Sequence, residues 1–195
     1  MKRSPANSTV SGLACSLRRF AEIRDQVWIL ALNFTPKKIA CRHSELEQVV
    51  LPLLRGRVFH VTTEEAFNDI CRCGWIDSQR QVEFFFNPAR SANCYGRNRR
   101  WVSVYDLSNG SESEIKHALT GYWLFKRFRI ERTYVFLIVV ESAWPSLISW
   151  THASREVGGK ELFVPFVEAW YPGNMSIDLF SESLAVSVHS SLAVV

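Results

Sequence analysis

The chain has 195 residues, of which 47% are hydrophobic and 22% are charged. This composition supports one ordinary domain with a hydrophobic core and excludes a wholly disordered chain. The net charge of +4 is too small to indicate a nucleic-acid partner by itself. Residues 1–100 hold 16 Lys/Arg against 9 Asp/Glu, whereas residues 101–195 hold 7 against 10. The first half is therefore suited to attract an anion, and the second to supply carboxylates.

Cysteine usage and apolar runs predict where the protein resides. The five cysteines are an odd number without the spacing of a disulfide framework, so we expect reduced thiols in a cytoplasmic protein. Apolar runs such as Val135 to Val140 are far too short to cross a bilayer, and polar residues interrupt any N-terminal signal sequence. The pair Cys71-Arg72-Cys73 has the wrong spacing for zinc, and we expect no metal.

The sequence predicts two regions. Residues 1–43 form a loosely attached N-terminal extension, helical in part because apolar residues between positions 13 and 31 have helical spacing. Residues 44–195 form a single α+β domain. Ser44 and Glu47 predict a capping box at its first helix, which Pro52 ends or kinks.

A strand then leads directly into a second helix. Arg57 to Thr62 is rich in β-branched and aromatic residues, as is typical of a strand. Thr62 and Glu65 predict a second capping box, and Gly74 is placed to end the helix that follows. His60 therefore lies near the end of a strand, beside a helix N-terminus.

The rest of the chain predicts a strand-rich second half. Residues 77–100 are rich in Arg, Asn and Gln and predict a long functional loop. A strand over 101–107 follows, and then a helix capped by Ser111 and Glu114. We expect a central strand over 133–140 and a short helix over 144–150. The last two strands span 162–170, which carries Glu168, and 177–188, which pairs behind the turn at 171–174.

Three short segments combine residue types that are typical of ligand binding. Phe59-His60-Val61-Thr62 places a histidine before a helix whose N-terminal amides attract anions. Tyr95-Gly96-Arg97-Asn98-Arg99-Arg100 places phosphate-binding arginines before a strand that carries Ser103 and Tyr105. Glu168 lies in an apolar strand, where a carboxylate is costly unless it faces a cleft or a partner.

Taken in order, these segments resemble the split active site of the ADP-ribosyltransferase fold, a mixed β-sheet core with flanking helices. The resemblance covers about residues 55–190 by order of elements, and its motif agreement lies in His60-Val61-Thr62, the Ser103/Tyr105 strand and Glu168. It implies that His60 orients NAD, that Ser103 or Tyr105 lines the nicotinamide site, and that Glu168 is the catalytic carboxylate.

The resemblance further implies an enzyme that consumes NAD as a substrate and passes ADP-ribose to an unknown macromolecular acceptor. A toxin or defence effector, with an antitoxin or immunity partner, is the role it suggests. Position 166 is Phe, so the Glu-x-Glu or Gln-x-Glu pair of arginine-modifying members is absent, which favours a different acceptor or none. Beyond the resemblance, we expect the bound NAD to contact Thr62, Tyr95, Arg97 and Arg100. The arginines, together with the neighbouring Arg99, would neutralise its pyrophosphate.

Other interpretations of the same residues remain open. An RNA 2′-phosphotransferase-like enzyme keeps the fold and NAD but changes the acceptor, and a non-catalytic module uses the Arg-rich loop to bind nucleic acid or protein. His60 is also explained as a strand histidine bonded to backbone, Glu168 as an ion-pair partner of a loop arginine, and Ser103 and Tyr105 as ordinary sheet residues.

Overall fold

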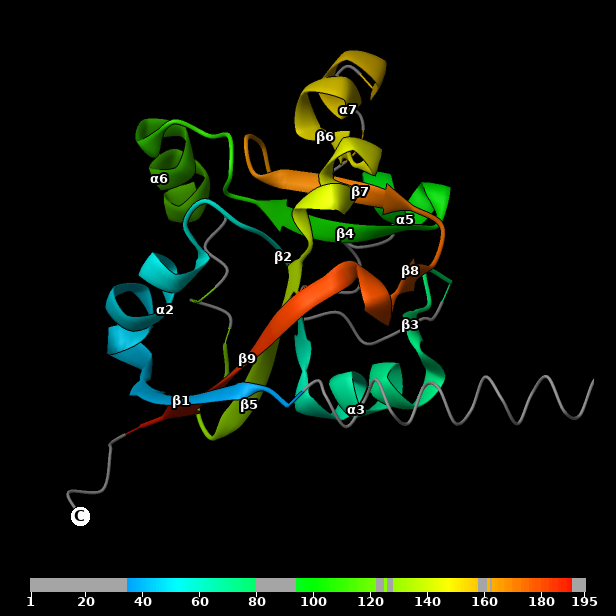
Figure 1. The fold of residues 1–195 in the computed structure, drawn as a ribbon. Helices are drawn as coiled ribbons and strands as arrows, with labels where there is room; N and C mark the ends of the chain where they lie inside the picture. The colour runs from blue at the N-terminus through cyan, green and yellow to red at the C-terminus, as the bar shows by residue number, and fades with distance from the viewer. Residues whose placement is uncertain are drawn as a thin grey trace, which may run out of the picture.

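The structure is a computed structural model that describes residues 35–79, 94–121, 125, 128–157, 161 and 163–190. These residues form a mixed α+β fold with a seven-stranded and a two-stranded sheet (Figure 1). The helix expected between positions 13 and 31 lies outside the described residues, as does the part of the predicted loop from 80 to 93.

The main sheet has the strand order β1-β9-β5-β2-β4-β7-β6. In that order the strands are β1 (Lys37–Arg42), β9 (Phe180–His189), β5 (Arg132–Val139), β2 (Val58–Thr63), β4 (Trp101–Asp106), β7 (Glu168–Pro172) and β6 (Ile148–Ser149). β1 and β9 are parallel, and the other neighbouring pairs are antiparallel. The smaller sheet joins β3 (Trp75–Ile76) and β8 (Met175–Ser176).

Helices cover both faces of this sheet. α2 (Leu46–Leu54) and α6 (Glu112–Gly121) share one core cluster with the sheet, and α3 (Glu64–Cys73), β3 and β8 share another on the opposite face. The central strand β5 is buried on both sides from Tyr134 to Val139, which explains its unbroken apolar sequence.

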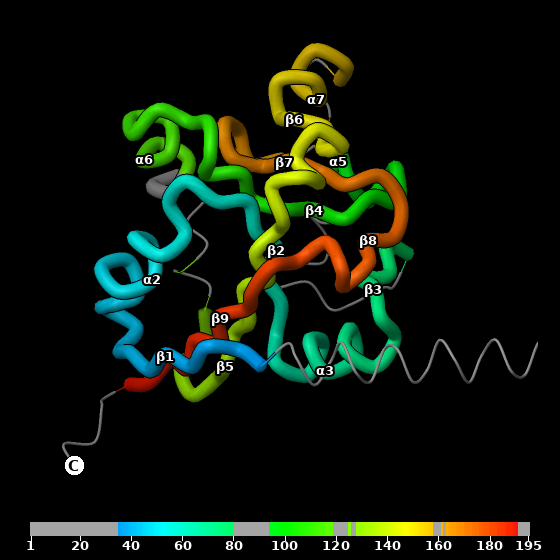
Figure 2. The backbone as a smooth tube through the Cα atoms, viewed as in Figure 1, coloured from blue at the N-terminus to red at the C-terminus, as the bar shows by residue number. Residues whose placement is uncertain are grey.

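The pairing between β2 and β4 is short. It consists of Val58 with Asp106 and Phe59 with Tyr105, whereas β2 pairs with β5, and β4 with β7, over five residues each. Beyond Phe59 and Tyr105 the two parts of the sheet separate, as the tube in Figure 2 shows. We call this point the fork.

Several predicted elements are confirmed. The strands expected over 57–62, 101–107 and 133–140 correspond to β2, β4 and β5. At α6, Ser111 N–H donates to Glu114 Oε2 (2.9 Å) while Ser111 Oγ accepts from Glu114 N–H (3.3 Å), which is the expected capping box. Gly74 ends α3 with φ of 84°, a left-handed conformation that glycine adopts without strain.

The start of α3 differs from its prediction by one residue. Thr63, not Thr62, is the N-cap, and its Oγ1 accepts the Ala66 N–H at 3.2 Å. The reason is that Thr62 and Thr63 still pair with β5, so the strand continues one residue further than expected.

The capping box predicted at Ser44 is wrong. Glu45 instead accepts from the N–H and the guanidinium of Arg42, and a 3-10 turn, η1 (His43–Glu45), precedes α2. α2 continues two residues beyond Pro52, so the proline does not end the helix, although it lacks the N–H that would bond the carbonyl four residues earlier.

The second half of the chain departs further from prediction. The helix expected over 144–150 is replaced by the 3-10 segment η3 (Glu141–Ser146), β6 and a helix α7 (Trp150–Val157). β7 begins at Glu168 rather than at residue 162, because a turn precedes it. β9 follows η4 (Ile177–Leu179) and pairs with β5 and β1, not behind the turn at 171–174.

The main sheet also includes residues from before position 44. β1 spans Lys37–Arg42 and pairs with β9, although the predicted N-terminal extension ran to residue 43. Residues 37–42, which the prediction places in the N-terminal extension, are therefore part of the main sheet.

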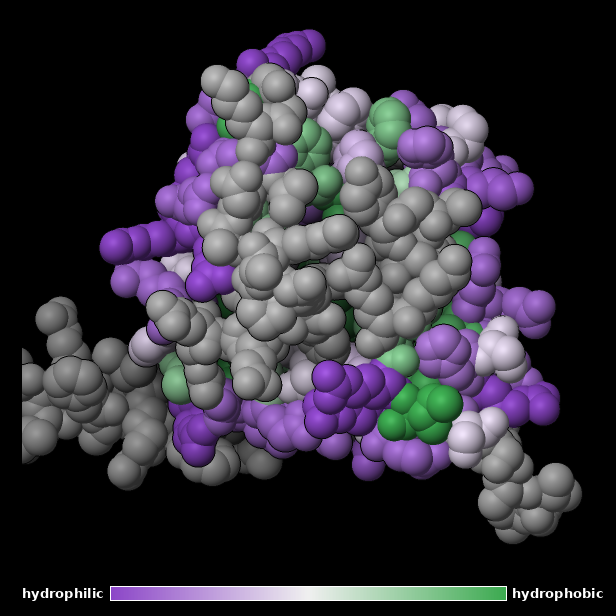
Figure 3. All heavy atoms as spheres, turned by 180° about the vertical axis from the view of Figure 1, so that it is seen from behind, coloured by the Kyte–Doolittle hydropathy of each residue, from purple (hydrophilic) through white to green (hydrophobic). Residues whose placement is uncertain are grey.

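The described surface is mostly polar. Seen from behind, hydrophilic side chains dominate the coloured part of Figure 3. The exposed large hydrophobic side chains of the described residues are Val49, Trp75 and Ile130. No helix in these described ranges is both long and apolar enough to cross a membrane.

Candidate functional site

Three of the predicted site residues are linked by hydrogen bonds at the fork. The ring Nδ1 of His60 lies 2.8 Å from the carbonyl oxygen of Ser103, and Ser103 Oγ donates to Glu168 Oε1 at 2.6 Å. Each residue comes from a different strand, β2, β4 and β7, and these strands are neighbours in the sheet. We call these three residues the fork cluster.

The strand register explains this grouping. Ser103 pairs with Trp170, and Tyr105 pairs with Glu168, so the Ser103 and Glu168 side chains are diagonal neighbours on one face. His60 lies one residue past the last β2–β4 pair. Because the strands no longer pair there, the Ser103 carbonyl accepts from the imidazole.

The contact to the Ser103 carbonyl fixes the tautomer of His60. A carbonyl oxygen only accepts hydrogen bonds, so Nδ1 carries the proton and Nε2 carries the lone pair of a neutral ring. Burial lowers the pKa of His60, which the bond to Ser103 offsets in part, and this favours the neutral form. His60 can therefore accept a hydrogen bond from a ligand hydroxyl at Nε2.

Glu168 is a half-buried carboxylate with a donor on each oxygen. Ser103 donates to Oε1, and the backbone N–H of Val164 donates to Oε2 at 2.6 Å. Burial raises the pKa of Glu168, whereas the bonds from Ser103 and Val164 act in the opposite direction. Trp170 is a third, weaker contributor that lowers this pKa. A carboxylate has about four acceptor positions, so these groups do not use all of the accepting capacity of Glu168.

Tyr105 and Thr62 occupy different surroundings. Tyr105 is buried in the core, where its ring stacks on Phe59 with 5.5 Å between centroids. Thr62 is a buried strand residue that pairs with Val135 and does not cap α3. The geometry therefore favours Ser103 over Tyr105 as the middle-strand residue of the site.

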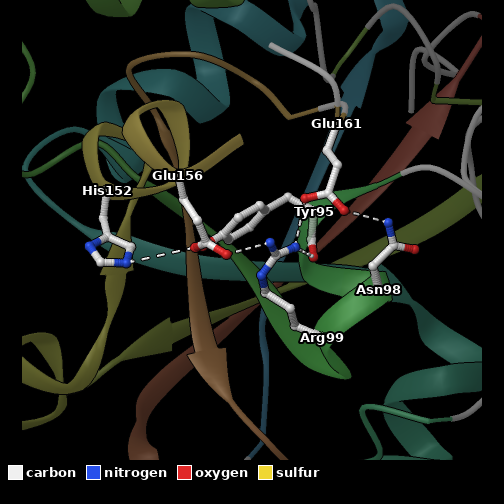
Figure 4. A network of polar contacts seen from close by, with 6 residues as sticks. All are labelled: Tyr95, Asn98, Arg99, His152, Glu156 and Glu161. Carbon is white, nitrogen blue, oxygen red and sulfur yellow. Dashed lines mark hydrogen bonds and ion pairs between the residues drawn. The ribbon is translucent and has the colours of Figure 1, made fainter. Parts of the chain in front are cut away.

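The arginine-rich segment folds as a short helix, α5 (Tyr95–Arg99), whose polar side chains bind other parts of the protein (Figure 4). Tyr95 is buried and donates to Glu156 Oε2 at 2.5 Å; burial, followed by this bond, raises the pKa of Tyr95 to about 12. Arg99 lies between Glu156 and Glu161, with 2.6 Å to each. Tyr95 and Arg99 are thus engaged in internal contacts.

The other two arginines of the segment lie on the surface. Arg97 and Arg100 are exposed, and Arg100 ends α5 in a left-handed conformation (φ 57°). Their exposure makes both side chains accessible to an anionic ligand in solvent.

Sequence reasoning missed the residues that support Glu168 from outside the fork cluster. Val164 acts through its backbone N–H, for which no sequence signal exists. Trp170 packs against Gly96, where a Cβ would come within 2.6 Å of its Nε1. The lone glycine between Tyr95 and Arg97 was the available sign of such a close approach.

The described residues offer no metal centre: no three or more of their His, Cys, Asp and Glu side chains are arranged to hold an ion. In that part of the chain Cys41, Cys71, Cys73 and Cys94 form no disulfide. No protein-family model, curated protein or solved structure matches this chain. Function is therefore inferred from the geometry of the fork cluster.

Proposed function

We propose that the fork cluster is the NAD site of an ADP-ribosyltransferase-like enzyme that cleaves the nicotinamide N-glycosidic bond. The observation that carries this proposal is the hydrogen-bonded series from His60 through Ser103 to Glu168. These residues come from three neighbouring strands and meet where the sheet divides, in the order that the resemblance implies.

The chemistry needs a fixed negative charge. When the bond between the ribose and nicotinamide breaks, its electron pair leaves with the ring nitrogen and positive charge develops on the ribose. A carboxylate held in place before the reaction stabilises that charge without reorganising. Glu168 meets this requirement because Ser103 and Val164 orient both of its oxygens.

The remaining roles follow from donor and acceptor properties. Neutral His60 accepts from a ribose hydroxyl at Nε2, which holds the substrate rather than transferring a proton. The exposed Arg97 and Arg100 attract the pyrophosphate. Together these groups match a ligand that carries hydroxyls, phosphates and a cationic ring that leaves as neutral nicotinamide.

The acceptor in this proposal is not arginine. Phe166 takes the place of the second carboxylate that arginine-modifying members carry, and its ring packs 4.7 Å from that of Trp150. Water or another nucleophile therefore attacks the ribose carbon after nicotinamide leaves.

The substitution Glu168→Gln tests the proposal. It keeps the shape and a hydrogen-bonding oxygen but removes the charge, so nicotinamide release from NAD should fall at least about 100-fold. Release is measured by liquid chromatography on purified protein. The matched control is Glu182→Gln, which removes a half-exposed strand glutamate paired with Arg57 and should leave the rate unchanged.

The products separate the alternatives. ADP-ribose, free or on a protein, supports the transferase, whereas ADP-ribose 1″,2″-cyclic phosphate from 2′-phosphorylated RNA identifies the phosphotransferase. Salt-sensitive nucleic-acid binding without NAD turnover identifies a binding module. Full activity of folded Glu168→Gln protein would falsify the role of Glu168.

A further inference from the structure

Helix α5 holds the segment that precedes Glu168 through an arginine-centred network (Figure 4). Arg99 donates to Glu156 and Glu161, and its guanidinium lies 3.7 Å above the centre of the Tyr95 ring. Asn98 donates to the second oxygen of Glu161 at 2.7 Å. We call these five residues the Arg99 clamp. Both oxygens of Glu161 are thus bound by α5.

Charge reinforces the clamp. Hydrogen bonds from Tyr95 and Arg99 lower the pKa of Glu156, and hydrogen bonds from Asn98 and Arg99 lower that of Glu161. Both carboxylates are therefore ionised at neutral pH. A planar guanidinium can bridge two carboxylates in a fixed geometry, which an ammonium group cannot.

Aromatic rings extend the contact between α5 and β7. The Phe163 ring lies edge-on to Tyr95 (6.5 Å) and to Trp170 (6.0 Å). Gly96 packs against the Trp170 indole so closely that no Cβ fits between them. α5 therefore contacts the chain on both sides of Glu168.

The path from the clamp to the carboxylate is short. Glu161 is three residues before Val164, whose N–H donates to Glu168 Oε2 and whose carbonyl accepts the Glu168 N–H. Between them, Phe166 has φ of 69°, a conformation that costs free energy for an L residue and persists only where neighbours hold it. The turn before β7 is therefore fixed by the clamp at one end and by the sheet at the other.

We propose that Arg99 is a positioning residue that fixes the Glu168 carboxylate by anchoring Glu161 and the turn that contains Val164. This inference rests on the proposed function for its catalytic meaning. Its structural content is independent of that function. In this proposal Arg99 contacts neither the fork cluster nor the substrate. Its effect on the position of Glu168 therefore passes through the backbone N–H of Val164.

The test compares Arg99→Gln with the control Arg57→Gln, which removes the half-exposed ion pair between Arg57 and Glu182. In Arg99→Gln, hydrogen exchange of the Val164 amide should accelerate about tenfold, since a charge-assisted bond anchoring the turn is lost. The Phe136 amide of β5 should keep its protection in both variants. Arg99→Lys, which keeps the charge but not the fork geometry, should recover only part of the effect.

Activity supplies the second readout. Losing the Val164 donor raises the pKa of Glu168 further, so the acid limb of the kcat profile should move to higher pH while KM for NAD changes little. A merely structural role would lower the amplitude of the profile without moving that limb. If the wild type cleaves no NAD, the proposed function fails. The positioning role of Arg99 is then still decided by two measurements, hydrogen exchange of the Val164 amide and an NMR titration of the Glu168 carboxyl group.

Unchanged Val164 exchange and an unchanged Glu168 titration in folded Arg99→Gln protein would overturn the inference. Should that variant not fold, Glu161→Gln removes the same ion pair from the other side and keeps an oxygen for Asn98. It is expected to accelerate Val164 exchange in the same way, and wild-type protection in this variant contradicts the proposal.

Discussion

Burial moves the pKa values of His60 and Glu168 in opposite directions, and in each case it favours the neutral form. Their hydrogen bonds oppose this effect only in part. A neutral imidazole suits an acceptor of ribose hydroxyls. In the proposed reaction, the negative charge of Glu168 is favoured when positive charge develops on the ribose in the transition state.

Neutral His60 makes stability depend on pH. Unfolded histidine has a pKa of about 6.5, and the folded value is lower, so the unfolded chain binds more protons between the two. The His60 contribution is thus complete above pH 6.5 and is lost as pH falls towards the folded pKa. Between pH 7.5 and 5.5 the free energy of unfolding, measured with urea, should fall in the wild type and fall less in His60→Asn. Equal falls in the two proteins contradict a lowered pKa of His60.

At the scale of elements, two signals that depend only on nearby residues are confirmed. The Ser111–Glu114 box and the αL glycine at Gly74 depend on residues a few positions apart, and both are found as expected. The predicted N-cap, Thr62, is one residue before the observed cap, Thr63. The reason is that pairing with β5, which is distant in sequence, determines where β2 ends. The partners of β9 were equally non-local and were not predicted.

The contact between α5 and β7 gives a prediction at this scale. In a helix, alanine is favoured over glycine by up to about 1 kcal/mol, yet a Cβ at Gly96 overlaps the Trp170 indole, and overpacking costs about 1–3 kcal/mol. Gly96→Ala should therefore lower the free energy of unfolding by about 1 kcal/mol or more, measured by urea titration.

The control for Gly96 is Gly110→Ala. There the nearest atom is the Ile115 Cγ1 at 3.0 Å, part of a side chain that can move, so the loss should be smaller. If Gly96→Ala is as stable as the wild type, the close approach of α5 to β7 is not tight in solution.

For the whole molecule, the sequence indicated an α+β domain and three of the residues that meet at the fork. His60 was singled out by its place before a helix N-terminus, Ser103 by the resemblance, and Glu168 because a carboxylate is costly in an apolar strand. Strand register, together with a partner 65 residues away, favours Ser103 over Tyr105. Tyr95 and Arg99 bind glutamates that lie 61 and 62 residues further along the chain. Such pairings follow from the assembled sheet and leave no local pattern.

We propose above that NAD binds and is cleaved at the fork cluster. Titration of NAD into labelled wild-type protein, followed by amide and proton NMR, tests it in one experiment. Shifts should concentrate on the amides of His60, Ser103, Val164 and Glu168, and free nicotinamide signals should grow with time. Shifts confined to β1 and α2, or no shift and no nicotinamide at millimolar NAD, would contradict the claim.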